Sequence, residues 1–159
     1  MNDTPLITSW TEYAQVAARL LAQAEHSISI FDADLSALRL EQPETSAALT
    51  RFFRSTPSTL VRISIRNPAP LRNSHPRLLE LLRLFSHKLE IRETPAQLSN
   101  LSDSILLVDN TSALIRFHND HPRSKEIIAS SELCRPYQKR FEDIWSEGGN
   151  QIFATVTGL

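Results

Sequence analysis

The chain has 159 residues, the usual size of one domain, so residues 1–159 are predicted to fold as one unit. Hydrophobic residues make up 41% and charged residues 22% of the chain, which is typical of a globular protein and not of a disordered one. The 17 basic and 18 acidic residues give a net charge of -1, which argues against a broad basic surface for nucleic acid.

The chain opens with a helix and a strand. Ser9 and Glu12 have the spacing of a capping box, and hydrophobic residues then recur at helical spacing through residue 24. The segment SISIF at 27–31 is predicted to form a short strand, which ends in an Asp-Ala-Asp turn.

The middle of the chain continues this alternation of helices and strands. A helix is predicted at 43–53, and the strict alternation of hydrophobic and polar residues at 60–65 predicts a strand. Pro76 suits the first turn of a third helix that runs to residue 85, and 88–92 is predicted as a third strand.

The last third of the chain is predicted to hold a hairpin, a helix and an edge strand. Pro136 lies inside the helical window, so the helix either starts near it or is kinked. The predicted elements are strands at 105–108 and 113–117, a polar loop at 119–125, a helix at 131–146 and an edge strand at 151–156.

The order of these elements predicts the fold class. Alternating helices and strands favour an α/β protein with α-β-α layers around a mixed, mainly parallel sheet. The hairpin adds an antiparallel part.

Several classes of site and location are excluded by what the sequence lacks. The three glycines all lie at or beyond position 148, so no glycine-rich phosphate loop joins an early strand to a helix. Cys134 is the only cysteine, and its hydrophobic neighbours favour a small buried residue over a nucleophile. No signal peptide and no membrane-spanning stretch is recognised, and a cytoplasmic protein is expected.

Four segments of the chain resemble the phospholipase D-like superfamily. They are AEHSISIFDADLS, LVRISIRNP, HKLEIRE and SDSILLVDNTSALIRF, and the resemblance covers roughly residues 10–146. It implies one half of the phospholipase D-like fold, in which two halves or two subunits face each other across one cleft. A homodimer is therefore expected.

The superfamily's signature is H-x-K-x4-D, followed by a Gly-Ser pair and an Asn, and most of it is missing here. The resemblance implies that the His attacks phosphorus and that the Lys and Asn hold the phosphate oxygens. Asp109 matches the signature's Asp. The other positions are filled by Ser102 for His, Ser104 for Lys, Arg116 and Phe117 for Gly-Ser, and Asp120 for Asn. Without the nucleophile and the cation, phospholipase D-type catalysis is not expected.

A more local resemblance is carried by FDADLS, RNP, RFHNDHPR and FEDIW. Together these look like an uncharacterised proteobacterial domain, whose relatives occur alone or joined to an acetyltransferase domain. That resemblance implies no known activity.

Arginines near the ends of the predicted strands form a candidate anion-binding pocket, because guanidinium groups match phosphate and carboxylate geometry. The alternative is that they pair with nearby carboxylates as structural ion pairs. The arginines are Arg66, Arg92, Arg116 and Arg123, and the carboxylates are Asp32, Asp34, Glu90 and Glu93.

His118 and Asp109 are the candidate catalytic residues of a divergent hydrolase or phosphodiesterase, with Arg116 beside them. This hypothesis predicts that the three side chains lie within hydrogen-bond reach of one another. The alternative is a His118 ring that bonds Asp109 or the loop backbone. A metal site in the His118-Asn119-Asp120-His121 loop is not expected, since the usual upstream H-x-H is absent.

The leading hypothesis is therefore a non-catalytic phospholipase D-like domain that binds an anionic, phosphate-bearing ligand or a protein partner. The divergent hydrolase and a purely structural dimerisation module are the alternatives. No cofactor is expected.

Overall fold

The computed structural model describes residues 5–154. Its helices are α1 (Trp10–Gln23), α2 (Pro43–Ser55), α3 (Leu71–Ser74), α4 (Pro76–Leu84) and α5 (Ser131–Ser146), with short 3-10 turns η1 (Ser36–Leu38) and η2 (Ala96–Leu98). Its strands are β1 (Ser27–Asp32), β2 (Leu60–Ile65), β3 (Leu89–Glu93), β4 (Ser104–Val108), β5 (Ser112–Arg116), β6 (Ser124–Ile127) and β7 (Gln151–Ile152).

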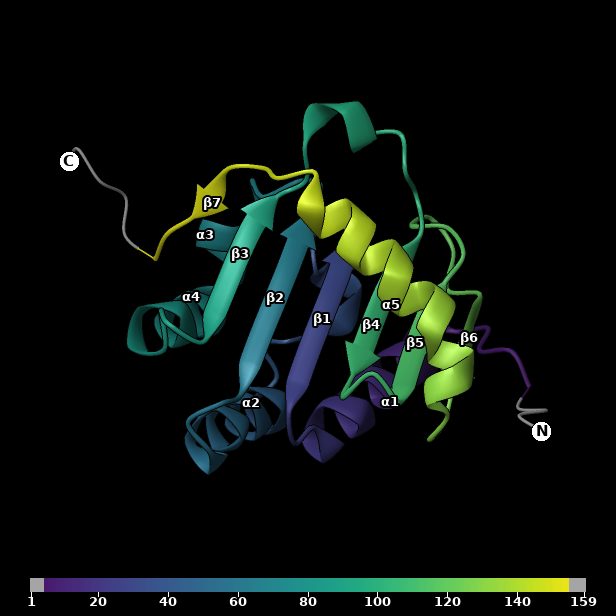
Figure 1. Cartoon of the computed structure of the whole chain (residues 1–159), viewed down its shortest axis with the longest axis horizontal. Coiled ribbons are helices and arrows are strands. Elements are labelled where there is room, and N and C mark those ends of the chain that lie inside the picture. The colour runs from purple at the N-terminus through teal and green to yellow at the C-terminus, as the bar shows by residue number, and fades with distance from the viewer. Residues whose placement is uncertain (1–4, 155–159) are drawn as a thin grey trace.

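The strands form one seven-stranded mixed sheet in the order β6-β5-β4-β1-β2-β3-β7. Strands β1, β2 and β3 are parallel, and each remaining pair is antiparallel. The predicted α/β class with a mixed sheet is confirmed, but the sheet is not mainly parallel, because four of its six strand pairs are antiparallel. We call the edge where β1, β2 and β3 end the upper edge, as drawn in Figure 1, and the opposite one the lower edge. Because β4 runs antiparallel to β1, the start of β4 and the end of β5 also lie at the upper edge.

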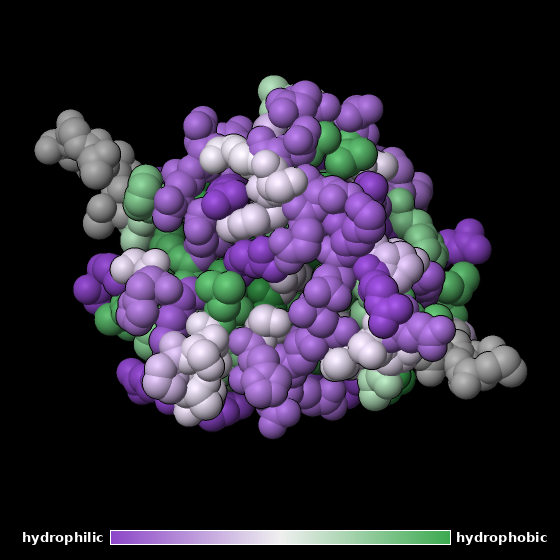
Figure 2. Space-filling view, viewed as in Figure 1, coloured by the Kyte–Doolittle hydropathy of each residue, from purple (hydrophilic) through white to green (hydrophobic). Residues whose placement is uncertain are grey.

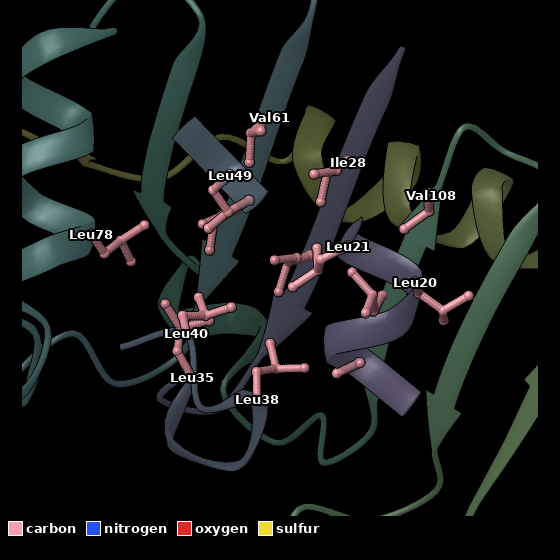
Figure 3. Packing of buried hydrophobic residues seen from close by; sticks show 14 of the residues in the cluster. Leu20, Leu21, Ile28, Leu35, Leu38, Leu40, Leu49, Val61, Leu78 and Val108 are labelled. Atoms are coloured by element: carbon pink, nitrogen blue, oxygen red, sulfur yellow. The ribbon is translucent and has the colours of Figure 1, made fainter. Parts of the chain in front are cut away.

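Helices cover both faces of the sheet. Helix α5 crosses one face, and α1, α2 and α4 pack on the other (Figure 1). Successive side chains of a strand point to opposite faces, so Ile28 and Ile30 join the cluster under α1 while Phe31 joins the one under α5. Figure 3 shows Leu21, Leu49 and Leu78 of the three helices converging on this first cluster.

The first and last helices, α1 and α5, begin with a serine cap. The Ser9 hydroxyl accepts a hydrogen bond from the Glu12 backbone N–H at 3.1 Å, and the Ser130 hydroxyl does the same for Leu133 at 3.2 Å. Helix α5 thus begins at Ser131 and continues past Pro136, which removes one intrahelical donor. The interpretation in which the helix starts near Pro136 is wrong.

Three described elements were not predicted: strand β6, helix α3 and the 3-10 turn η1. Strand β6 lies partly in the predicted loop 119–125, because four residues with a charged centre give too short an alternation to recognise. Helix α3 is a single turn. The predicted edge strand 151–156 is present only as Gln151–Ile152, and positions 155 and 156 lie outside the described residues, as do 1–4 of the segment judged to hold no signal peptide.

The face crossed by α5 is mostly hydrophilic, with separate small apolar patches (Figure 2). Among the helices of residues 5–154, none is long and apolar enough to cross a bilayer. Cys134 is fully buried, as predicted, and burial raises the pKa of its thiol to about 11.

Candidate functional site

The upper edge holds a buried ion pair beside Ser104, the position that the sequence resemblance aligns with the signature's Lys. Arg116 ends β5 and Asp32 ends β1, and their side chains are only 2% and 1% exposed. The Arg116 Nη2 atom donates to Asp32 Oδ1 at 2.8 Å and to Ser104 Oγ at 3.1 Å. The guanidinium group therefore lies against Ser104, the residue that fills the signature's Lys position.

Polar and aromatic groups complete the surroundings of this pair. The second Asp32 oxygen accepts from the Leu35 backbone N–H at 2.7 Å, and Arg116 Nη1 donates to the Asn119 carbonyl at 2.7 Å. The Arg116 guanidinium also lies 5.2 Å from the Trp10 ring and 5.1 Å from the Tyr13 ring. Burial, with a smaller effect from the Asp32 charge, raises the pKa of Tyr13 to about 12.

A second group of charges lies beside the pair, on the α5 face. Arg66 follows β2, donates from Nη1 to the Asp103 carbonyl at 2.9 Å, and stacks over Phe31 at 4.6 Å. Arg140 of α5 makes a two-pronged ion pair with the Asp103 carboxylate at 2.7 and 2.9 Å. Burial lowers the pKa of the Arg66 guanidinium. The carboxylates of Asp32 and Asp103 raise this pKa, whereas the charges of Arg116 and Arg140 lower it further.

These two groups together form what we call the upper-edge network: Asp32, Arg66, Asp103, Arg116 and Arg140. It contains three guanidinium groups and two carboxylates. Two of its buried nitrogens, Arg66 Nη2 and Arg116 Nε, have no hydrogen-bond partner. Buried polar groups are usually paired, so these two N–H groups point to a missing acceptor such as a water or an anion.

A hollow of about 430 Å³ opens above Arg116 on the α1 face. Its size is within the range of small-ligand sites. It is lined by Trp10, Ala33, Asp34, Ser36, Ala37, Arg39, Arg116, Asn119 and Asp120.

The remaining signature positions lie around the same edge. Ser102 is half-buried, and its carbonyl accepts from the Asn119 backbone N–H at 2.7 Å. Phe117 is 43% exposed, and Asp120 is an exposed loop residue. No imidazole or ammonium group replaces the missing His and Lys at positions 102 and 104.

Asp109 lies at the lower edge of the sheet, because it follows β4, which runs opposite to β1. The expectation that it lies with Arg116 and His118 is wrong. Its carboxylate accepts hydrogen bonds from the backbone N–H groups of Glu25, His26 and Ser27 at 2.7 to 3.2 Å. Its φ of 57°, with 56° at Asn110, makes the tight turn into β5, a conformation that Asp and Asn tolerate. Asp109 is thus a turn and capping residue.

His118 lies in the loop after β5 and bonds its own loop. Its Nδ1 accepts from the Asp120 backbone N–H at 3.1 Å, and its ring centroid lies 5.7 Å from that of His121. Within residues 5–154, no group of three or more His, Cys, Asp or Glu side chains could hold a metal ion.

The other two candidate arginines are not in the upper-edge network. Arg92 pairs with Glu90 at 2.6 Å and lies 3.9 Å from the Trp145 ring of α5. Arg123 lies 6.0 Å from the Phe117 ring. The four arginines therefore do not form one pocket, and the pairs Arg116–Asp32 and Arg92–Glu90 are structural ion pairs of the alternative kind.

Sequence reasoning missed four contributors to the site. Tyr13 and Trp10 belong to a helix with an ordinary amphipathic pattern, Asp103 lies in a polar segment before a predicted strand, and Arg140 lies on the outer side of a predicted helix. No local pattern singles them out, because each acts on a residue distant in the sequence.

A scan of protein families matches residues 9–152 to the domain of unknown function DUF7931. The chain belongs to this family. The DUF7931 match covers almost all of the described residues. No curated protein matches the chain.

Two solved structures share the fold of this DUF7931 chain. TrmBL2, described as an archaeal chromatin protein with a novel mode of DNA binding, has a TM-score of 0.66 at 14% identity. The match covers 94% of this chain and 56% of TrmBL2, so the chain spans little more than half of that protein. NucT from Helicobacter pylori has a TM-score of 0.55 at 9% identity, with 89% and 94% of the two chains covered. The fold of the DUF7931 chain is therefore similar to the phospholipase D-like fold of NucT.

Proposed function

We propose that this DUF7931 chain is a non-catalytic phospholipase D-like module that binds an anionic ligand at the upper-edge network. The observation that carries the proposal is that this network has more positive than negative groups and too few hydrogen-bond acceptors. Three guanidinium groups face two carboxylates, and Arg66 Nη2 and Arg116 Nε have no acceptor. A bound oxyanion would supply that acceptor and offset the excess positive charge.

Phosphoryl transfer is excluded from the proposal for a chemical reason. The reaction of the superfamily needs a nucleophilic imidazole and a cation free to hold the phosphate oxygens. Here Ser102 and Ser104 fill those positions. The guanidinium next to Ser104 is bound to Asp32 and is 2% exposed, so it is not free to follow a reacting phosphate.

The divergent-hydrolase alternative required His118, Asp109 and Arg116 to act together. Asp109 is engaged with backbone N–H groups at the lower edge, so no carboxylate of that set reaches His118. DNA binding is stated for TrmBL2 and is not proposed here, since a net charge of -1 supplies no broad basic surface. The homodimer and the structural dimerisation module stay predictions.

The test combines an activity assay with anion binding. Purified protein is incubated with a chromogenic phosphodiester, for which no turnover above a heat-treated sample is expected. Binding of inorganic phosphate is then measured by calorimetry for the wild type and for Arg66→Gln. We expect the substitution to weaken phosphate binding at this site about tenfold, as expected for one charge-assisted hydrogen bond.

Arg62→Gln is the matched control, because Arg62 lies on β2 four residues before Arg66 and on the same α5 face, but pairs with Glu142 of α5. It should leave phosphate binding unchanged. Turnover of the phosphodiester that disappears in Ser102→Ala would overturn the non-catalytic assignment. Equal phosphate affinity in wild type and Arg66→Gln would mean that only water fills the network.

A further inference from the structure

A second hollow lies where α2 and α4 begin, next to the turn that follows β1. It has a volume of about 390 Å³. Ser36 and Arg39 of the turn, Gln42 and Pro43 at the start of α2, and Ser74 and His75 at the start of α4 line it. Both helices follow parallel strands, so their N-termini lie together at the upper edge, where α/β proteins gather ligands.

The two helix starts bring positive potential to this hollow. A helix N-terminus carries unpaired N–H groups and about half a positive charge. Both helices have Pro in the first turn, Pro43 and Pro76, and neither N-cap residue, Gln42 or His75, caps its helix with its side chain. The helices have 13 and 9 residues, long enough to have a full N-terminal turn.

The two helix starts differ in their side-chain caps. Glu41 accepts from the backbone N–H groups of Arg77 and Leu78 of α4 at 2.9 and 3.0 Å. For α2, no side chain in residues 5–154 accepts from the N–H groups of its first turn, although the exposed Glu44 adds a negative charge there. The start of α2 therefore keeps N–H groups that no side chain caps.

Two further side chains in the hollow lack partners. His75 is 4% exposed, and its Nδ1 atom is buried without a hydrogen bond. Arg39 is exposed, and within the described part of the chain it forms no ion pair and no side-chain hydrogen bond. Its φ of 52° is a left-handed conformation that is unfavourable for a residue with a Cβ atom. A strained arginine and an unsatisfied buried imidazole beside two helix starts are typical of a binding site.

We propose that this hollow binds a phosphate group, either inorganic phosphate or a phosphomonoester. The uncapped start of α2 would donate backbone N–H groups to the phosphate oxygens, and Arg39 and His75 would contribute side-chain contacts. The volume exceeds that of one phosphate, which leaves room for an esterified group. This site uses none of the five residues of the upper-edge network, so it does not depend on the proposed function.

The test is calorimetric titration at constant ionic strength in an Arg66→Gln background, which weakens the upper-edge network. Inorganic phosphate and glycerol 3-phosphate are titrated separately, so that free phosphate and phosphomonoester are distinguished. Arg39→Gln should weaken binding of the preferred ligand about tenfold, since one charge-assisted contact is lost. Gln keeps the Cβ atom, so the backbone strain at position 39 is unchanged.

Arg51→Gln is the matched control. Arg51 is an exposed arginine of α2 away from the hollow, and its loss should leave affinity unchanged. Glu41→Gln should have the opposite effect and tighten binding, because it removes the only carboxylate of the hollow. A merely structural Glu41 would not improve affinity when neutralised. His75→Asn should weaken binding, and Arg39→Gln decides the outcome if that variant does not fold.

The inference is overturned if neither phosphate nor glycerol 3-phosphate binds in the Arg66→Gln background, or if Arg39→Gln and Arg51→Gln bind equally well. The proposed function would survive either result, provided that the wild type still binds phosphate through Arg66. Loss of binding only on Arg66 substitution would leave the upper-edge network as the sole site.

Discussion

The two ends of β4 differ in how they relate to the phospholipase D signature. At the lower edge, Asp109 matches the signature, and its carboxylate accepts from three consecutive backbone N–H groups where β1 begins. At the upper edge, Ser102 and Ser104 stand at the positions compared with the signature's His and Lys, and the Arg116–Asp32 pair fills the space beside them. The lower end of the strand therefore agrees with the signature in residue type, whereas the upper end does not.

This difference separates two kinds of requirement on one strand. The Asp109 carboxylate is needed wherever the chain must turn at that edge and satisfy the N–H groups of 25–27, whatever the protein does. A nucleophile and a cation at the other end serve only a reaction. Once they are absent, the buried space at the upper edge can be filled by an internal ion pair.

The largest expected effect is at the upper edge. Asp32→Ala leaves the Arg116 charge buried without a counter-charge and should lower the free energy of unfolding by about 4 kcal/mol. Urea denaturation measures this, with Asp34→Ala as the control, because Asp34 lies on the same turn but its carboxylate accepts only from Ser36. The double variant Asp32→Ala, Arg116→Met should recover much of the loss. If Asp32→Ala costs no more than Asp34→Ala, the pair does not hold this edge together.

A smaller effect is expected at the lower edge. Asp109→Ala removes the acceptor of three backbone N–H groups and also strains a positive-φ position, so a loss of about 3 kcal/mol is expected. Asn110→Ala isolates the strain, because Asn110 has nearly the same φ and makes no such contacts. It should cost about 1 kcal/mol. Equal losses in the two variants would show that the Asp109 carboxylate contributes nothing beyond its turn conformation.

The smallest effect is a dependence of stability on alkaline pH. The pKa of Tyr13 is raised from 10.0 to about 12. The stability that comes from its buried neutral phenol is therefore fully present below pH 10 and is lost as the pH rises toward 12. The slope is at most about 1.4 kcal/mol per pH unit. Thermal unfolding at stepped alkaline pH should show this slope in the wild type and a shallower one in Tyr13→Phe.

Ultraviolet absorbance follows the Tyr13 phenol in the same experiment. The only other tyrosine, Tyr137, is present in both the wild type and Tyr13→Phe, so the difference between the two proteins isolates the Tyr13 signal. This signal should appear only with the unfolding transition. A Tyr13 signal that appears before unfolding would contradict the burial of this phenol.

Much of the fold could be predicted from local patterns. The alternation at 60–65 predicts β2, and the Ser9–Glu12 spacing predicts the start of α1. Strand β6 was not predicted, because Lys125 and Glu126 leave no hydrophobic alternation in its four residues. Its place in the sheet depends on pairing with β5.

The site was less predictable, because the sequence does not give the direction of a strand within its sheet. The hydrophobic run at 105–108 predicts a strand, but only its antiparallel pairing with β1 decides which edge Asp109 occupies. The same reversal brings Ser104 and Arg116 next to Asp32, which is 72 positions before Ser104 in the chain. That pairing was among the structural ion pairs considered for the arginines, whereas the contributions of Tyr13 and Arg140 were not foreseen.

The place of β4 in the sheet also has a consequence for how the chain acquires its structure. The parallel unit of β1, β2 and β3 is complete by residue 93, but one side of β1 stays unpaired until residues 104–108 are available. During that interval a hydrophobic central strand exposes its backbone hydrogen-bonding groups and could pair with a strand of another molecule. Slow refolding and concentration-dependent aggregation are therefore expected of fragments that stop before β4.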